Sequence, residues 1–187
     1  MRCGSHALPT TVVEMDERMP RRGDAGDAAA LIRTLTGRSL TIATAESLTG
    51  GLLAAALVDV PGASVVFSGG VVAYATPLKA TLLGVDRDLL AERGPVDPEV
   101  ARQMADGVRR ALAVAGRPVD IGVATTGVAG PDAQDGKPPG SVFVAVAMGD
   151  IVDVVPLALS GTRDEIRAAT VRAALGAVMT RLAKTVE

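Results

Sequence analysis

The chain has 187 residues, and its 19 basic and 21 acidic side chains give a formal net charge of −2. This length fits one ordinary domain, and a hydrophobic fraction of 48% excludes an intrinsically disordered chain. The charge balance and an aromatic content of only 2% argue against a protein that binds nucleic acid. The longest uncharged run, residues 60–78, is interrupted by Pro61 and by glycines, so we expect no membrane-spanning segment.

Residues 1–25 mix charges, proline and glycine without a sustained hydrophobic period, so we expect a flexible extension there and one domain over residues 26–187. The only cysteine, Cys3, and the only histidine, His6, lie in this extension. The domain is therefore not expected to hold a Cys/His zinc site or a histidine-dependent nucleophile. The absence of an intrachain disulfide suits a cytoplasmic protein. Acid–base chemistry would have to use Ser, Thr, Tyr, Lys or carboxylates.

Helix and strand patterns alternate along the domain. In chain order the sequence predicts a helix over 27–37, a strand over 39–45, a helix over 49–58, a strand over 65–74, a helix from Thr76 to Gly84, a helix from Asp97 to Leu112, a strand over 119–125, a loop over 126–140, two hairpin strands over 141–148 and 151–159, and a last helix that begins near Thr162. This order indicates a layered α/β domain with a mixed sheet.

The first segment with polar detail is Ala45–Gly51, AESLTGG, at a strand-to-helix turn. A serine in such a turn can project from the sheet edge, and the N–H groups that follow it can stabilise negative charge. Ser47 is thus a candidate nucleophile, and Thr49 and Gly50 are candidate contacts for an oxyanion. The alternative is that Ser47 or Thr49 is only a helix N-cap and that Glu46 lies on the surface.

The second segment is Tyr74–Lys79, in which Lys79 falls in the first turn of a helix among apolar residues. Burial beside a helix N-terminus would lower the pKa of this lysine, as a general base requires. The alternative is a lysine whose ammonium simply reaches water.

Two further segments could hold a substrate. Thr125, Thr126 and Gly127 begin a glycine-rich loop whose hydroxyls and N–H groups could bind an amide, a sugar or a phosphate, although neither the P-loop nor the dinucleotide-binding spacing is present. Arg163 and Arg167 lie one turn apart at the start of the last helix, which suits a phosphate. A plain strand-to-loop turn and ordinary helix-surface charge are the alternatives.

Taken together, the segments resemble the CinA C-terminal domain family. The resemblance covers about residues 27–185 and rests on six stretches in the same order: AESLTGG (45–51), the YxxxxK spacing (74–79) followed by LLGV (82–85), GPV (94–96), TGVAGPD (126–132), KPPGSV (137–142) and GTRDEIR (161–167).

The resemblance implies a three-layer α/β/α sandwich with a mixed, mostly parallel sheet, and a homo-oligomer of two or more chains. It implies an amidohydrolase that converts nicotinamide mononucleotide to nicotinate mononucleotide and ammonia, with Ser47 and Lys79 as a Ser–Lys pair. Tyr74 would position Lys79 or relay protons, and Arg163 would contact the phosphate. No metal or organic cofactor is expected, and the partner is a small nucleotide.

Leu48, Thr76, Pro77 and Thr162 depart from the residues usual in the family. Because these positions are expected near the pocket, they keep a second hypothesis open. In that hypothesis the chain is a nucleotide-binding or competence- and damage-associated module without catalytic activity.

Overall fold

The computed structural model describes residues 25–185 of the chain. The extension predicted for the N-terminus falls, except for Ala25, outside the described residues. In chain order the helices and strands are α1 (Ala25–Arg38), β1 (Ile42–Glu46), α2 (Leu52–Val58), the short 3₁₀ helix η1 (Ala63–Val65), β2 (Phe67–Val72), α3 (Thr76–Leu83), α4 (Arg87–Arg93), α5 (Pro98–Ala111), β3 (Ile121–Gly127), β4 (Ser141–Met148), β5 (Ile151–Ala158) and α6 (Arg163–Ala183).

The strands of this part of the chain form one mixed sheet in the order β2-β1-β3-β4-β5. β1 pairs in parallel with both β2 and β3, whereas β4 is antiparallel to its neighbours β3 and β5. Only β4 therefore runs against the other strands, as expected for a mostly parallel sheet that ends in a hairpin. The carboxyl ends of β1 and β3 meet at one edge, where ligands of such sheets commonly bind.

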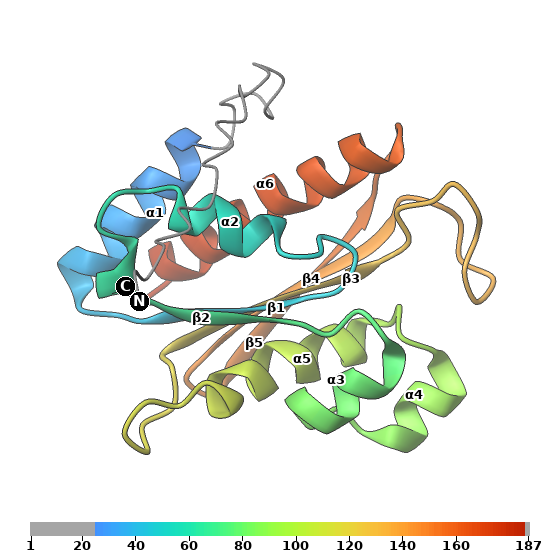
Figure 1. Cartoon of the computed structure of the whole chain (residues 1–187), viewed down its shortest axis with the longest axis horizontal. Coiled ribbons are helices and arrows are strands. Elements are labelled where there is room, and N and C mark those ends of the chain that lie inside the picture. Colours follow the sequence, from blue (N-terminus) through green and yellow to red (C-terminus); the bar gives the residue numbers. More distant parts are fainter. Residues whose placement is uncertain (1–24, 186–187) are drawn as a thin grey trace, which may run out of the picture.

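Helices cover both faces of the sheet, which confirms the predicted three-layer sandwich. Figure 1 shows α1, α2 and α6 on one face and α3, α4 and α5 on the other. Leu31, Leu35 and Leu175 belong to the apolar core on the first face, and Met104 and Val108 belong to the core on the second. Because no tryptophan is present and phenylalanine is scarce, aliphatic side chains and alanine build both cores.

Local chemistry explains where the helices begin. The Asp97 carboxylate accepts hydrogen bonds from the first N–H groups of α5, and Thr162 and Glu165 form a complete capping box on α6. α2 begins at Leu52, later than the predicted 49, because Gly50 and Gly51 take left-handed conformations. The sequence patterns did not predict α4, a seven-residue helix that Asp86 caps.

Close packing of α3 on α5 depends on Gly107. A Cβ atom at this position would lie 1.8 Å from the backbone oxygen of Leu83, the last residue of α3. We expect Gly107→Ala to lower the free energy of unfolding by about 3 kcal/mol or more, because backbone rather than a flexible side chain must move. Gly176→Ala in α6 is the matched control, since nothing lies within 4 Å of its added Cβ. It should instead stabilise the protein by about 0.5–1 kcal/mol in urea denaturation.

A search of the described residues finds no helix that is both long and apolar enough to cross a membrane.

Candidate active site

Ser47 follows directly after the last residue of β1, at the sheet edge where β3 also ends. Its backbone N–H donates to the Thr125 oxygen at 3.0 Å, which ties the residue to β3. The chain then turns through residues 48–51 into α2, and the Gly50 N–H donates back to the Ser47 oxygen at 3.1 Å. Ser47 therefore lies on a tight strand-to-helix turn, as the sequence predicted.

Glu46 is fully buried beside this turn, so the interpretation of it as a surface residue is wrong. Its carboxylate accepts hydrogen bonds from the N–H groups of Gly51, Leu53 and Ala54 at 2.9, 3.1 and 2.8 Å. A carboxylate is stable at this place because the first N–H groups of a helix carry partial positive charge and need acceptors. Glu46 thus fixes the start of α2 and the glycine end of the turn.

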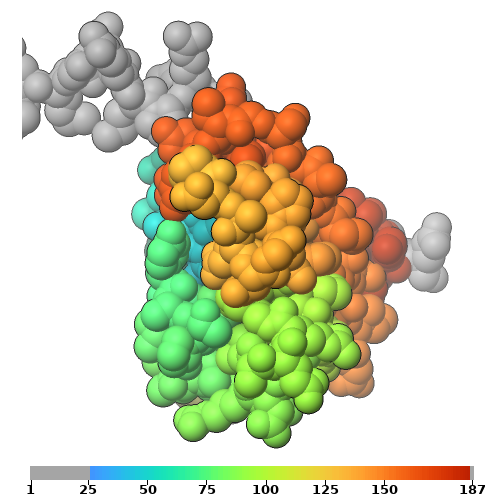
Figure 2. Space-filling model, turned by 90° about the vertical axis from the view of Figure 1, so that its right-hand side faces the viewer, coloured from blue at the N-terminus to red at the C-terminus, as the bar shows by residue number. Residues whose placement is uncertain are grey.

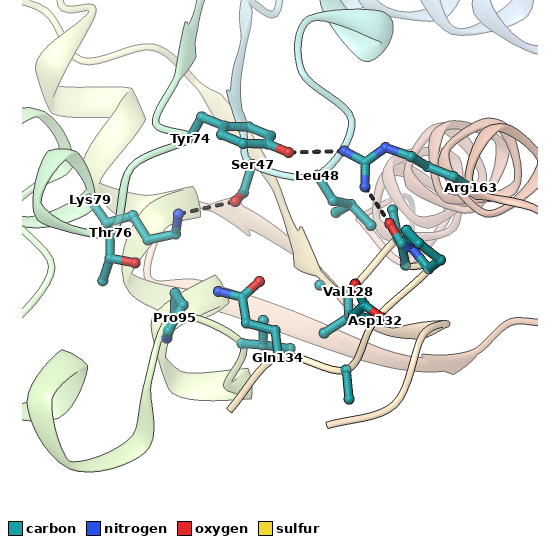
Figure 3. Close-up of a pocket in the computed structure, with 16 residues that line it drawn as sticks. Ser47, Leu48, Tyr74, Thr76, Lys79, Pro95, Val128, Asp132, Gln134 and Arg163 are labelled. Atoms are coloured by element: carbon teal, nitrogen blue, oxygen red, sulfur yellow. Dashed lines mark hydrogen bonds between the residues drawn. The ribbon is translucent and has the colours of Figure 1, made fainter. Parts of the chain in front are cut away.

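Lys79 reaches the same edge from α3. Its Nζ atom lies 3.0 Å from the Ser47 Oγ atom and donates to the Ala73 oxygen at 2.7 Å (Figure 3). The side chain is 0% exposed, and it is among the largest fully buried side chains of the described residues. No carboxylate forms an ion pair with it in the part of the chain that the structure describes, so its charge would be stabilised by neutral oxygens alone.

Burial lowers the pKa of Lys79 from 10.5 to about 8, because desolvation disfavours the ammonium form. A substantial fraction of this amine is therefore unprotonated at mildly alkaline pH. When neutral, Nζ can keep one N–H directed at the Ala73 oxygen while its lone pair accepts the hydroxyl proton of Ser47. This is the relation between a nucleophile and its general base.

A cavity of about 360 Å³ opens above the pair. Its walls come from the turn after β1, from the β2–α3 and α4–α5 connections, from α3, from the end of β3 and the loop after it, and from the start of α6. The lining residues are Ser47, Leu48, Tyr74, Thr76, Lys79, Pro95, Val96, Gly127, Val128, Ala129, Gly130, Pro131, Asp132, Ala133, Gln134 and Arg163. Figure 2 shows the loop that follows β3, in orange-yellow, between the start of α6 and the green helices α3 and α4.

Tyr74 and Arg163 meet at the mouth of the cavity (Figure 3). Arg163 donates to the Tyr74 hydroxyl oxygen at 2.9 Å and to the Gly130 oxygen at 2.6 Å. The phenol thus pairs with the arginine, and no hydrogen bond joins it to Lys79. Among the described residues that line the cavity, Arg163 is the only cationic one apart from Lys79.

The remaining predicted substrate contacts divide into two groups. Gly127 lines the cavity, whereas Thr49, Gly50, Thr125 and Thr126 are not among its lining residues. Thr49 and Thr125 are buried and joined by a hydroxyl–hydroxyl hydrogen bond of 2.8 Å, and the Thr126 hydroxyl donates to the Pro95 oxygen at 2.6 Å. These threonines hold the turn, β3 and the α4–α5 connection together beneath the cavity.

The four positions that the sequence analysis gives as departures from the resembled family also divide. Leu48 and Thr76 line the cavity, but Pro77 and Thr162 do not. Pro77 stands in the first turn of α3, and Thr162 caps α6 immediately before Arg163. Only the first two departures can therefore touch a ligand in the cavity directly.

The fold and this edge of the sheet define the chain as a three-layer α/β/α protein with a buried lysine hydrogen-bonded to a serine at the floor of an open cavity. The model of the CinA C-terminal domain matches residues 25–182. The chain belongs to this family.

Solved structures with the same fold include the competence/damage inducible protein CihA from Agrobacterium tumefaciens, which is 35% identical with a TM-score of 0.80 over 87% of this chain and 98% of that one. A CinA superfamily protein from Escherichia coli is 28% identical, with a TM-score of 0.78 over 90% of this chain and 94% of that one. Curated relatives include a CinA-like protein of Frankia casuarinae, 46% identical over 86% of this chain. The chain spans only 36% of the length of that relative.

Proposed function

We propose that the chain is an amidohydrolase that releases ammonia from nicotinamide mononucleotide through Ser47 and Lys79. The observation that carries this proposal is the 3.0 Å contact between the Lys79 Nζ atom and the Ser47 Oγ atom on the floor of a cavity. A surface lysine with an ordinary pKa would stay protonated and could not act as a base. Burial of Lys79 supports the catalytic hypothesis over the alternative that its ammonium reaches water.

In the proposed reaction, neutral Lys79 accepts the Ser47 hydroxyl proton while Oγ attacks the carboxamide carbon. As the tetrahedral intermediate collapses, the Lys79 ammonium protonates the amide nitrogen, the C–N bond breaks, and ammonia departs to leave an ester on Ser47. The amine, neutral again, then takes a proton from water as the water oxygen attacks the ester. Lys79 returns this proton to the Ser47 Oγ atom as the ester C–O bond breaks and the acid is released. Each step passes one proton through Nζ, so no second titrating residue is required.

The negative oxygen of the intermediate needs hydrogen-bond donors. The Gly50 N–H already donates to the Ser47 oxygen, and the N–H of Gly51 is held by Glu46. Among the described residues, the N–H groups of Leu48 and Thr49 donate to no other group, and Leu48 lines the cavity. We therefore assign the oxyanion contact to the Leu48 N–H in place of Thr49 and Gly50.

Release of ammonia from three nicotinamide compounds tests the proposed function. Purified protein should release ammonia from nicotinamide mononucleotide at pH 8.5, with lower kcat/KM for nicotinamide riboside and for nicotinamide. Binding of the nucleotide by calorimetry without ammonia release at any pH would favour the non-catalytic module, which the departures at Leu48 and Thr76 in the cavity wall would then explain.

The activity should rise with pH. Because the reaction needs the neutral amine, kcat/KM should increase about tenfold per pH unit below the pKa of Lys79, near 8, and level off above it. A pH–rate profile between 6 and 10 measures this, with the stability of the protein checked at each end. A flat profile across pH 8 would contradict the role of Lys79 as the base.

Arg163 should act on the phosphate. Arg163 is an exposed cation at the cavity mouth. It can make charge-assisted hydrogen bonds to the phosphate of a nucleotide whose carboxamide lies at Ser47. Arg163→Gln should raise KM for nicotinamide mononucleotide about tenfold, while the kcat/KM for nicotinamide riboside, which has no phosphate, stays within about twofold. An equal loss for both substrates would place the phosphate elsewhere.

A further inference from the structure

Arg167 does not join Arg163 at the cavity, where the sequence suggested a phosphate-binding pair. It lies one turn further along α6, and its guanidinium donates from Nε to the Leu48 oxygen at 3.0 Å and from Nη2 to the Thr49 oxygen at 2.9 Å. Its Nη1 atom lies 3.7 Å from the exposed Asp164 carboxylate. One arginine thus binds the carbonyls of the two residues that follow Ser47.

These carbonyl contacts also fix N–H directions. A trans peptide is planar, so its N–H points opposite to its carbonyl. The contact with the Leu48 oxygen therefore sets the direction of the Thr49 N–H. The contact with the Thr49 oxygen does the same for the Gly50 N–H, which donates to the Ser47 oxygen. The planar fork of the guanidinium suits two neighbouring carbonyls.

The turn needs such a restraint because its far end is made of glycine. Gly50 and Gly51 have φ values of 59° and 98°, a region that glycine enters readily and leaves readily. Glu46 holds the Gly51 end, and Arg167 holds the Leu48–Thr49 end. Ile166, the neighbour of Arg167 on α6, packs in one small apolar cluster with Leu48. Two neighbouring side chains of α6, Ile166 and Arg167, thus contact the turn.

We propose that Arg167 is a positioning residue for the serine turn. By binding the Leu48 and Thr49 oxygens it fixes the Gly50 N–H, and through the hydrogen bond from this N–H to the Ser47 oxygen it holds Ser47 and the unpartnered Leu48 N–H in reactive geometry. This inference rests on the proposed function for its kinetic consequence, although it also makes a prediction that needs no substrate. It gives α6 two separate roles, one at the mouth of the cavity and one behind its floor.

Arg167→Gln should lower kcat about 100-fold while KM changes less than about threefold, because misplacement affects the reacting atoms more than ground-state binding. The midpoint of the pH–rate profile should stay near 8, since Lys79 does not touch Arg167. Arg167→Lys keeps the positive charge but loses the two-pronged guanidinium, so its kcat should lie between those of the wild type and Arg167→Gln. Arg102→Gln is the matched control, because it removes an arginine that hydrogen-bonds Glu99 on α5. It should leave kcat unchanged.

A reagent that reports on Ser47 alone separates this inference from the identity of the substrate. Phenylmethanesulfonyl fluoride reacts when Oγ forms a bond to sulfur, fluoride leaves and the hydroxyl proton passes to Lys79. Mass spectrometry of the Ser47 peptide should show labelling at least about tenfold slower in Arg167→Gln than in the wild type. If Arg167→Gln is labelled more slowly but the wild type hydrolyses no nicotinamide compound, the inference about Arg167 is supported and the proposed substrate is rejected.

Labelling of Arg167→Gln at the wild-type rate, with circular dichroism and a thermal melt that show a folded protein, would overturn the inference. Should Arg167→Gln not fold, Arg167→Lys decides by the same assay, with labelling at the wild-type rate as the contradicting result. Two other results would assign Arg167 a merely structural role. One is a kcat loss in Arg167→Gln no larger than that in Arg102→Gln. The other is a change in KM accompanied by a shift in the midpoint of the pH–rate profile.

Discussion

Replacing Ser47 with alanine should reduce kcat for ammonia release from nicotinamide mononucleotide by about 1,000-fold or more, since loss of a nucleophile leaves only binding and oxyanion stabilisation. The fold should persist. The Ser47 side chain makes one hydrogen bond, to Lys79, and that amine keeps the Ala73 oxygen as a partner. We expect the free energy of unfolding to change by less than about 1 kcal/mol.

Ser64→Ala is a suitable control, because this exposed serine lies in η1 and away from the cavity. When wild type, Ser47→Ala and Ser64→Ala are assayed in parallel, Ser64→Ala should keep the wild-type kcat and Ser47→Ala should not. If Ser47→Ala were to release ammonia at the wild-type rate, another nucleophile would have to be sought among the lining residues.

Lys79→Met should lower kcat about as strongly as Ser47→Ala does, but it should make the protein more stable near neutral pH. The pKa of Lys79 is lowered from 10.5 to about 8, so the folded state disfavours the proton that the unfolded chain binds. At 1.36 kcal/mol per pKa unit this amounts to about 3 kcal/mol of destabilisation. Methionine removes it, at a cost of about 1–2 kcal/mol for the Ala73 oxygen and Ser47 hydroxyl left without a partner. The net expected gain is about 1–2 kcal/mol.

The sign of this effect depends on pH. The penalty is complete below pH 8, where the folded protein must carry the ammonium, and disappears as pH rises through 10.5, where both states are neutral. Urea denaturation of Lys79→Met and wild type at pH 6.5 and pH 10 should therefore give an advantage for the variant that shrinks or reverses at the higher pH. A variant that is equally destabilised at both values would show that Lys79 is not kept at a lowered pKa.

Most elements of the fold could be predicted because their signals are local. The apolar period of α5, its Asp97–Pro98 start and the capping box of α6 all act within one or two turns. The α4 helix was missed because it has only seven residues, and its core-packing side chains, Leu89 and Leu90, are adjacent in the sequence and show no helical period. The late start of α2 depends on the conformations of Gly50 and Gly51, which tertiary contacts with Glu46 and Arg167 select.

The candidate site was predictable in part. Ser47 and Lys79 were each a candidate with a structural alternative, and the resemblance to the CinA C-terminal domain family singled them out as a pair, in agreement with the scarcity of histidine and lysine. Their mutual distance could not be predicted, because 32 residues separate them along the chain. The buried role of Glu46 and the reach of Arg167 to residues 118 and 119 positions away depend on how α2 and α6 pack, which no local pattern encodes. Thr125 and Thr126 were proposed as ligand contacts, but their hydroxyls have partners within the protein.

The covalent intermediate tests the central claim most directly. Wild-type protein mixed with nicotinamide mononucleotide and quenched with acid during turnover should carry, on the peptide that contains Ser47, an added mass equal to the substrate less ammonia. The same peptide from Lys79→Met should remain unmodified. An adduct on any other residue, or ammonia release that continues in Ser47→Ala with no adduct formed, would contradict the account.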